Sequence, residues 1–191
     1  MLRHRTEPTC NGAFKGFSRI VSGACALLAA LLMPIVATSA DIDWDETIGL
    51  IRSKFPDVEH LSTARLAELL STSAQGEIVL LDVRELDEYQ VGHLSGAVLA
   101  TDVEMALEAF GDRVRHETIV VHCAVGYRFS RLATKLESRG YDSVFNLEGS
   151  LFKWANEGRP MHRDTTCVEE VHPYDDEWGQ LLAPRYRSEP D

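Results

Sequence analysis

Apolar runs and amphipathic stretches alternate along the chain between residues 58 and 156. The runs Ile78–Val83 and Thr118–His122 are aliphatic and β-branched, and their length suits strands buried on both faces of a sheet. Between the runs, apolar residues recur at helical spacing, as in Val103, Leu107 and Phe110. This alternation predicts an α/β fold, with helices covering both faces of a mostly parallel central sheet.

The same pattern gives approximate bounds for the elements. We expect strands at residues 58–61, 78–83, 97–100, 118–122 and 143–147. We expect helices at residues 41–55, 63–70, 103–110, 128–139 and 150–156. Ser62 is a suitable N-cap for the second helix, and Leu66, Leu69 and Leu70 are expected on its inner face.

The N-terminal region has the pattern of an export signal. A basic polar segment precedes an uncharged apolar run at residues 20–37, and the small-residue sequence Ala37-Thr38-Ser39-Ala40 follows. This order predicts that residues 1–40 are a signal peptide cleaved after Ala40, and that the mature protein is extracytoplasmic and periplasmic. The alternative is an uncleaved N-terminal anchor, in which case the protein contacts the membrane. Residues 41–60 would then be an N-terminal helical extension.

Composition narrows the class of partner. The chain carries 19 basic and 30 acidic residues, for a net charge of -11. This balance argues against binding to nucleic acid or to an anionic membrane surface. Four cysteines in 191 residues do not make a disulfide scaffold.

The loop from Cys123 to Arg128 has the composition of a reactive site. Cys123 follows a predicted buried strand and precedes a predicted helix, whose first amide groups lack intrahelical acceptors. Those amides and the Arg128 charge favour the nucleophilic thiolate, and Gly126 permits a left-handed backbone. The alternative is that Cys123 is a small buried apolar residue.

Two further sets of polar residues are candidates for a site. Asp82 and Arg84 fall at the carboxyl end of a predicted strand. They either lie near the cysteine loop, because ligands bind at that edge of the sheet, or form a structural ion pair, and we favour the ion pair. In the tail, residues 162–191, the five-residue spacing of His162, Cys167 and His172 fits no common zinc or copper site, so we expect no metal. Trp178, Leu181 and Leu182 are expected to dock this tail on the domain.

The cysteine loop resembles the active-site loop of the rhodanese family, Cys-x-x-Gly-x-Arg. The resemblance covers residues 61–161 and rests on three groups of residues in order. The first group is Leu80-Leu81-Asp82-Val83-Arg84-Glu85, Glu88-Tyr89 and Gly92-His93-Leu94-Ser95-Gly96-Ala97, the second is the loop, and the third is Gly140-Tyr141, residues 144–150, Trp154 and Gly158-Arg159-Pro160.

The resemblance implies a three-layer rhodanese-like domain and a sulfurtransferase without cofactor or metal. Cys123 would take sulfur from a small donor such as thiosulfate and pass it, as a persulfide, to a thiol, a protein or cyanide. Arg128 would hold the anionic donor, and Ala124, Val125, Gly126 and Tyr127 would contribute backbone. His93 would be a scaffold residue rather than a general base.

Two other functions remain open on the sequence. Related phosphatases and arsenate reductases use Cys-x5-Arg, whereas Phe129 occupies that offset here, so the shorter loop favours sulfur over phosphate. The other alternative is a thiol redox relay or a sulfur-binding module. Ala124 and Val125 stand where the family often has a basic or polar residue, which suggests an apolar rim, and Cys167 could form a disulfide with Cys123 outside the cytoplasm.

Overall fold

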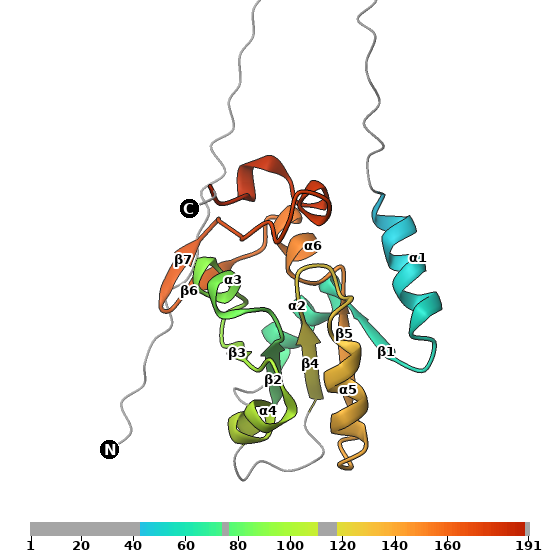
Figure 1. Ribbon diagram of the computed structural model, residues 1–191. Coiled ribbons are helices and arrows are strands. Elements are labelled where there is room, and N and C mark those ends of the chain that lie inside the picture. The colour runs from blue at the N-terminus through green and yellow to red at the C-terminus, as the bar shows by residue number, and fades with distance from the viewer. Residues whose placement is uncertain (1–42, 74–76, 111–117, 190–191) are drawn as a thin grey trace, which may run out of the picture.

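The computed structural model describes residues 43–73, 77–110 and 118–189. Its centre is a five-stranded sheet in the order β1-β5-β4-β2-β3, and every neighbouring pair is parallel. The strands are β1 (Glu59–Ser62), β2 (Ile78–Asp82), β3 (Val98–Leu99), β4 (Thr118–His122) and β5 (Val144–Glu148). The predicted parallel α/β sheet is therefore confirmed (Figure 1).

In the described ranges six α-helices accompany the sheet, and apolar residues divide between its two faces. The helices are α1 (Trp44–Lys54), α2 (Thr63–Thr72), α3 (Leu86–Val91), α4 (Val103–Phe110), α5 (Ser130–Glu137) and α6 (Ser150–Asn156). Val79 and Val121 belong to a core cluster shared with α4 and α5, whereas Leu80 and Val120 belong to a cluster shared with α2 and α6. Alternate residues of each central strand thus face opposite layers, as burial on both faces requires.

The tail forms structure that its sequence pattern did not predict. A hairpin of β6 (Met161–Arg163) and β7 (Thr166–Val168) begins one residue before the tail, and the short helices η1 (Trp178–Leu181) and η2 (Pro184–Tyr186) follow it. Val171, Leu181, Leu182 and Tyr186 are buried in the same cluster as α6, and Trp178 packs against it. The tail lies above the carboxyl ends of the strands (Figure 1), the edge at which ligands bind in open α/β sheets.

Several expected details need correction. Leu70 is 41% exposed and not on the inner face of α2, because burial along this helix follows Thr63 and Leu66 and fades in its last turn. The helix expected from residue 128 begins at Ser130, since residues 128 and 129 still form the turn that closes the cysteine loop. The expected N-cap of α2 is confirmed, with the Ser62 hydroxyl accepting from the Arg65 amide at 3.2 Å.

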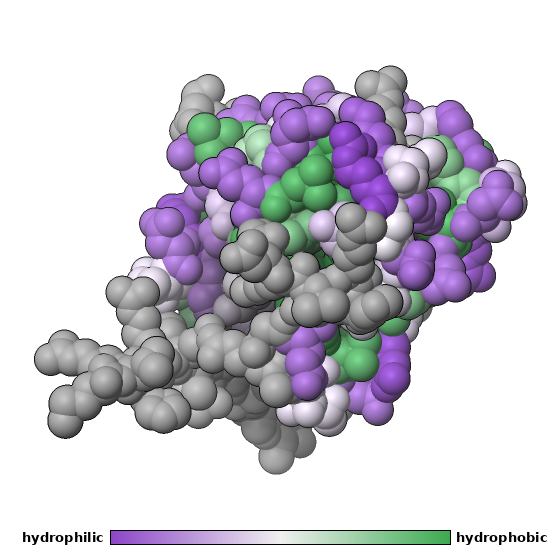
Figure 2. All heavy atoms as spheres, turned by 90° about the horizontal axis from the view of Figure 1, so that it is seen from below, coloured by the Kyte–Doolittle hydropathy of each residue, from purple (hydrophilic) through white to green (hydrophobic). Residues whose placement is uncertain are grey.

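Helix α1 is the described part of the predicted N-terminal extension. Asp43 caps it, and Ile51 is 3% exposed, in agreement with an amphipathic packing helix. The predicted signal segment, residues 1–40, lies outside the described residues. Among the helices that the structure describes, none combines the length and apolarity needed to cross a membrane. Figure 2 shows the face at the amino ends of the strands, where hydrophilic residues surround small apolar areas.

Candidate active site

The loop between β4 and α5 turns back on its own first residue. Cys123 follows the last residue of β4, at the carboxyl edge of the sheet, and its side chain is almost fully buried. The amide of Gly126 donates to the Cys123 sulfur at an N–Sγ distance of 3.1 Å. A backbone N–H directed at this sulfur stabilises negative charge on it, in the thiolate or in a derivative of it.

Residues of β5 and α6 hold the backbone of the loop from outside. The α6 amides of Leu151 and Phe152 donate to the Cys123 and Ala124 carbonyls at 3.2 and 3.0 Å. The Asn146 side-chain amide donates to the Gly126 carbonyl at 3.2 Å. The Ser150 hydroxyl, whose residue begins α6, accepts from the Cys123 amide at 3.2 Å. Three loop carbonyls are therefore satisfied by donors from outside the loop.

These contacts leave a set of amide donors in the loop. The amides of Ala124, Val125, Tyr127 and Arg128 have no hydrogen-bond acceptor among the residues that the structure describes. We call the backbone of residues 124–128 the amide cradle. Successive unpaired N–H groups beside a sulfur are suited to hold an anionic atom bonded to that sulfur.

Gly126 is required at its position for two reasons. Its φ angle is 103°, in the region that residues with a side chain rarely adopt, so the sequence-based expectation is confirmed. A Cβ atom there would also lie 3.2 Å from the Asn146 amide nitrogen and 3.3 Å from the Leu147 carbonyl oxygen. Both effects would displace the amide that contacts the Cys123 sulfur.

Arg128 is bound to the Glu88 carboxylate, which the sequence placed in a family motif but not at the site. Its two terminal nitrogens donate to the two oxygens of Glu88 at 2.6 and 2.7 Å, and the Glu88 side chain is only 3% exposed. Burial alone would lower the pKa of Arg128, but its hydrogen bonds to Glu88 and the nearby Cys123 and Glu88 charges raise it above the ordinary value. Arg128 therefore stays charged, with one edge committed to Glu88.

Asp82 and Arg84 form the structural ion pair that the sequence favoured. Both side chains are 0% exposed, and the Arg84 Nη2–Asp82 Oδ2 distance is 2.7 Å. The same nitrogen donates to the Gly92 carbonyl at 2.7 Å, which ties the end of β2 to the segment after α3. Burial raises the pKa of Asp82, but neighbouring His122 and Arg84 more than offset this, so that its pKa lies below the ordinary value.

His93 is held by contacts within the domain, and its expected role as a scaffold residue stays a prediction. Its ring stacks on Tyr89 with a centroid distance of 3.8 Å, and Nδ1 lies 2.9 Å from the Tyr89 carbonyl oxygen. Its backbone pairs with His162 of the β6–β7 hairpin. Burial lowers the pKa of His93, which favours the neutral form of the ring.

His122 is the last residue of β4, immediately before Cys123, and its complete burial predicts that the stability of the fold depends on pH. Burial lowers the pKa of His122 to about 4, from an ordinary value of 6.5. Between these two pH values the unfolded chain binds a proton at this residue and the folded chain does not, so lowering the pH favours unfolding. We expect the free energy of unfolding to fall by on the order of 3 kcal/mol from pH 6.5 to pH 4 on account of His122.

Urea denaturation at a series of pH values measures this effect. His93 and the half-buried His60, whose pKa values are also lowered by burial, add to the same slope. His122→Gln should therefore flatten the slope without abolishing it. An unchanged slope in that variant would contradict the assignment to His122.

The apolar rim expected from Ala124 and Val125 is wrong. These side chains are 2% and 4% exposed and belong to the core cluster that includes Leu181 and Leu182 of the tail. Their apolar character is explained by packing, and it does not define a surface for a substrate. Aromatic residues border the loop instead, and Tyr127 contributes one of them from within it.

The neighbours of Tyr127 come from both ends of the described chain. Its ring centroid lies 5.6 Å from that of Phe55 and 6.4 Å from that of Trp178. Lys54 of α1 hydrogen-bonds the Tyr127 hydroxyl and lies over its ring. The N-terminal extension and the tail therefore both contact the active-site loop.

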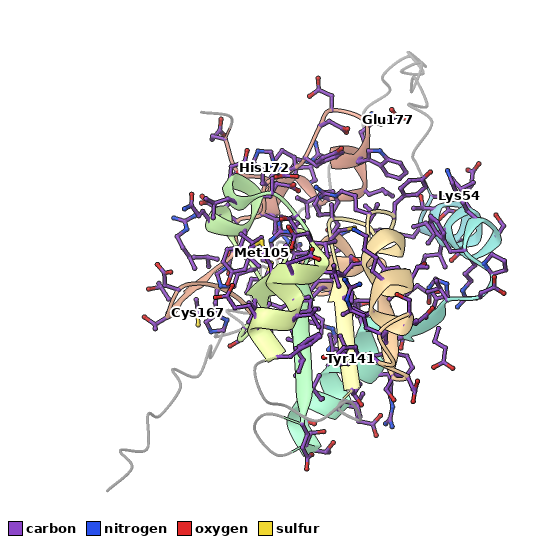
Figure 3. All side chains as sticks on the ribbon, turned by 60° about the horizontal axis from the view of Figure 1, so that its bottom comes forward. Lys54, Met105, Tyr141, Cys167, His172 and Glu177 are labelled. Atoms are coloured by element: carbon purple, nitrogen blue, oxygen red, sulfur yellow. The ribbon has the colours of Figure 1, made fainter. Side chains whose placement is uncertain are left out.

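The histidines and cysteine of the tail do not assemble a metal site. Cys167 lies opposite His162 in the β6–β7 register, with a Sγ–Nε2 distance of 3.7 Å, whereas His172 accepts from the Tyr174 amide at 3.0 Å. Within the described ranges, no three His, Cys, Asp or Glu residues gather as a metal would require. Cys123 is a free thiol, so it forms no disulfide with Cys167. Figure 3 shows Cys167 and Lys54 on opposite sides of the molecule.

Fold and site together define a class of protein. This is an open parallel α/β domain that presents a cysteine at the carboxyl edge of its sheet, inside a loop of unpaired amides. Residues 65–157 match the family model of the rhodanese-like domain, and the chain therefore contains a rhodanese-like domain.

Similar proteins share modest sequence identity with this chain. Thiosulfate sulfurtransferase GlpE of Pseudoalteromonas translucida is 25% identical over 96 residues, which are 50% of this chain and 88% of that protein. The tRNA uridine(34) hydroxylase of Erwinia tasmaniensis is 22% identical over 129 residues, or 62% of this chain. This chain spans only 35% of that hydroxylase's length.

A solved structure supports the fold. The thiosulfate sulfurtransferase of Pseudomonas aeruginosa superposes with a TM-score of 0.52 at 20% identity, covering 71% of this chain and 26% of that one. At this identity the likeness shows a shared fold and no more.

Proposed function

We propose that the protein is a sulfurtransferase that moves a sulfane sulfur from a donor, with thiosulfate as the reference compound, to a thiol or cyanide acceptor through a Cys123 persulfide. The observation that carries the proposal is the contact between the Gly126 amide and the Cys123 sulfur, surrounded by the free donors of the amide cradle. Membership of the rhodanese-like family and the similarity to a protein named thiosulfate sulfurtransferase support it.

The reaction follows from the geometry in two balanced steps. The Cys123 thiolate attacks the outer sulfur of the donor, a bond forms between the two sulfurs, and the donor's own S–S bond breaks. The bonding electron pair leaves with the remainder of the donor molecule, which is sulfite when the donor is thiosulfate. The cradle amides stabilise the charge on the terminal sulfur that Cys123 now carries.

In the second step an acceptor thiolate or cyanide attacks that terminal sulfur and regenerates the Cys123 thiolate. The cycle needs no further oxidant or reductant, because the donor is reduced as the acceptor is oxidised, and each S–S cleavage is matched by formation of one new bond to sulfur. The alternation of free and persulfide enzyme predicts ping-pong kinetics.

Loop length supports sulfur over phosphate as the transferred group. Four residues separate Cys123 from Arg128, and the Gly126 amide is already within 3.1 Å of the sulfur. Amides this close to the Cys123 sulfur are suited to hold one further sulfur atom bonded to it. A tetrahedral phosphoryl group bonded to Cys123 would need a wider ring of amide donors. A redox relay is less well supported, since the described site contains one free thiol and no disulfide partner for it.

A mass spectrum of the protein after treatment with a sulfane-sulfur donor tests the proposal. We expect one added sulfur atom on Cys123, removed again by cyanide with release of thiocyanate. Cys167→Ala serves as the control and should load to the same extent. Absence of added sulfur with every donor tried, or faster turnover of an aryl phosphate, would overturn the assignment.

Location outside the cytoplasm is part of the proposal and depends on the sequence of residues 20–40 alone. The intact mass of protein isolated from its native source reports whether the chain begins near Asp41.

A further inference from the structure

Arg128 is the one cationic residue among residues 124–128, and the Glu88 carboxylate neutralises its charge in the absence of a donor. Glu88 meets Arg128 with both carboxylate oxygens, and one of these also accepts from the Glu85 amide at 3.1 Å. That second bond belongs to the capping box that begins α3, so the carboxylate is held in place by its own helix. A bidentate pair of this kind is among the stronger side-chain contacts, and it leaves the cradle without a net positive charge.

The face of the same guanidinium is covered by an aromatic ring. Arg128 lies over the Tyr174 ring at 4.5 Å from its centroid, and Tyr174 is 44% exposed. Trp178, on the same segment of the tail, packs near Tyr127 of the loop. The border of the site is therefore largely aromatic. Lys54, a cation that reaches this border, is engaged with the Tyr127 hydroxyl and ring.

The tail segment that supplies these rings adds negative charge. Asp175, Asp176 and Glu177 follow Tyr174 directly and are all exposed (Glu177 is labelled in Figure 3). The whole chain has a net charge of -11. A field of this sign slows the approach of anions, and it does so most for those of highest charge.

Resting on the proposed sulfurtransferase function, we propose that the physiological sulfur donor is an organic persulfide with at most one negative charge, rather than the dianion thiosulfate. The carbon-bearing part of the donor would lie against Tyr174 and Tyr127, and its outer sulfur would face Cys123. The Cys123 thiolate forms a bond to that sulfur as the donor's S–S bond breaks. The donor leaves as a thiolate, which takes a proton from water, and Cys123 keeps the persulfide. Glu88 is a positioning residue, because it acts on the donor only through Arg128.

The test measures sulfur loading of Cys123 from two donors, thiosulfate and freshly prepared 2-hydroxyethyl persulfide. In the natural protein we expect the higher kcat/KM with the persulfide. Glu88→Gln leaves Arg128 with a neutral partner and should raise the thiosulfate-to-persulfide ratio of kcat/KM by about tenfold or more, mainly through a lower KM for thiosulfate. Any change in the nucleophilicity of Cys123 affects both donors and cancels in this ratio.

Asp87→Asn is the matched control. It removes the same unit of charge from the neighbouring, exposed position of α3 without touching Arg128, and its amide oxygen can still accept from the Glu88 amide. The ratio should change less than twofold in this variant. A second measurement needs no variant: added salt should speed loading of the natural protein by thiosulfate more than by the persulfide.

The possible results separate the two proposals. Efficient loading by thiosulfate with a lower kcat/KM for the persulfide would overturn the inference and leave the sulfurtransferase function standing. The inference would also fall if Glu88→Gln left the ratio unchanged while folded, or if salt slowed loading by thiosulfate. Failure of both donors to load Cys123 would overturn both proposals.

Discussion

Cys123→Ser should abolish sulfur transfer while leaving the fold intact. Serine keeps the size and the hydrogen bond from Gly126, but its hydroxyl is a far weaker nucleophile than a thiolate and forms no persulfide. We expect turnover to fall by at least about 1,000-fold, as for the loss of a covalent nucleophile in other enzymes. Release of thiocyanate from cyanide, with either donor, measures the effect.

Two controls make that result specific. The circular dichroism and urea midpoint of Cys123→Ser should match those of the natural protein, because the substitution is close to isosteric at a buried site. Cys167→Ala should keep full turnover, since the mechanism uses one thiol. Retained activity in Cys123→Ser would show that another residue is the nucleophile. Loss of activity in Cys167→Ala, together with a disulfide at Cys123 in the natural protein, would favour a redox relay.

Arg84→Met should cause the largest loss of stability of any single substitution considered for this domain. The change leaves the Asp82 carboxylate buried without its cation and removes the hydrogen bond to the Gly92 carbonyl. Removal of one partner of a buried ion pair costs about 3–5 kcal/mol. Urea denaturation at neutral pH should therefore show a much lower midpoint.

An exposed ion pair supplies the comparison. Arg52 pairs with Glu148 at 2.6 Å, but the Arg52 side chain is 61% exposed. Arg52→Met should cost less than about 1 kcal/mol, because solvent screens the pair. In the double variant Asp82→Leu with Arg84→Met, part of the lost stability should return, since no buried charge remains. Equal losses for Arg84→Met and Arg52→Met would contradict the structural role of the buried pair.

Local sequence determined much of the framework. The strands Ile78–Asp82 and Thr118–His122 lie within or at the expected bounds, because a continuous apolar run between charges has few alternatives to burial in a parallel sheet. Gly126 was identified from its place in a tight loop, and its φ angle bears this out. The pairing of Asp82 with Arg84 was also accessible, since two residues separated by one position meet within a single turn.

The elements that were missed share a physical cause. Helix α3 has six residues and little apolar periodicity, and its start is stabilised by the Glu85–Glu88 capping box rather than by a buried stripe. The β6–β7 hairpin has three residues in each strand, too few for an alternating pattern to be distinctive. Each depends on contacts with the rest of the domain for its stability.

The chemistry of the site was decided partly by the sequence and partly by tertiary structure. The sequence by itself placed Cys123, Gly126 and Arg128 in one short loop, because they lie within six consecutive positions. Only the tertiary structure set Glu88 against Arg128, 40 residues away in the chain, and packed the tail over the loop so that Ala124 and Val125 are core residues. Such contacts depend on how the order of the strands and the placement of the helices bring distant segments of the chain together. A local pattern of residues does not specify which distant segments will meet.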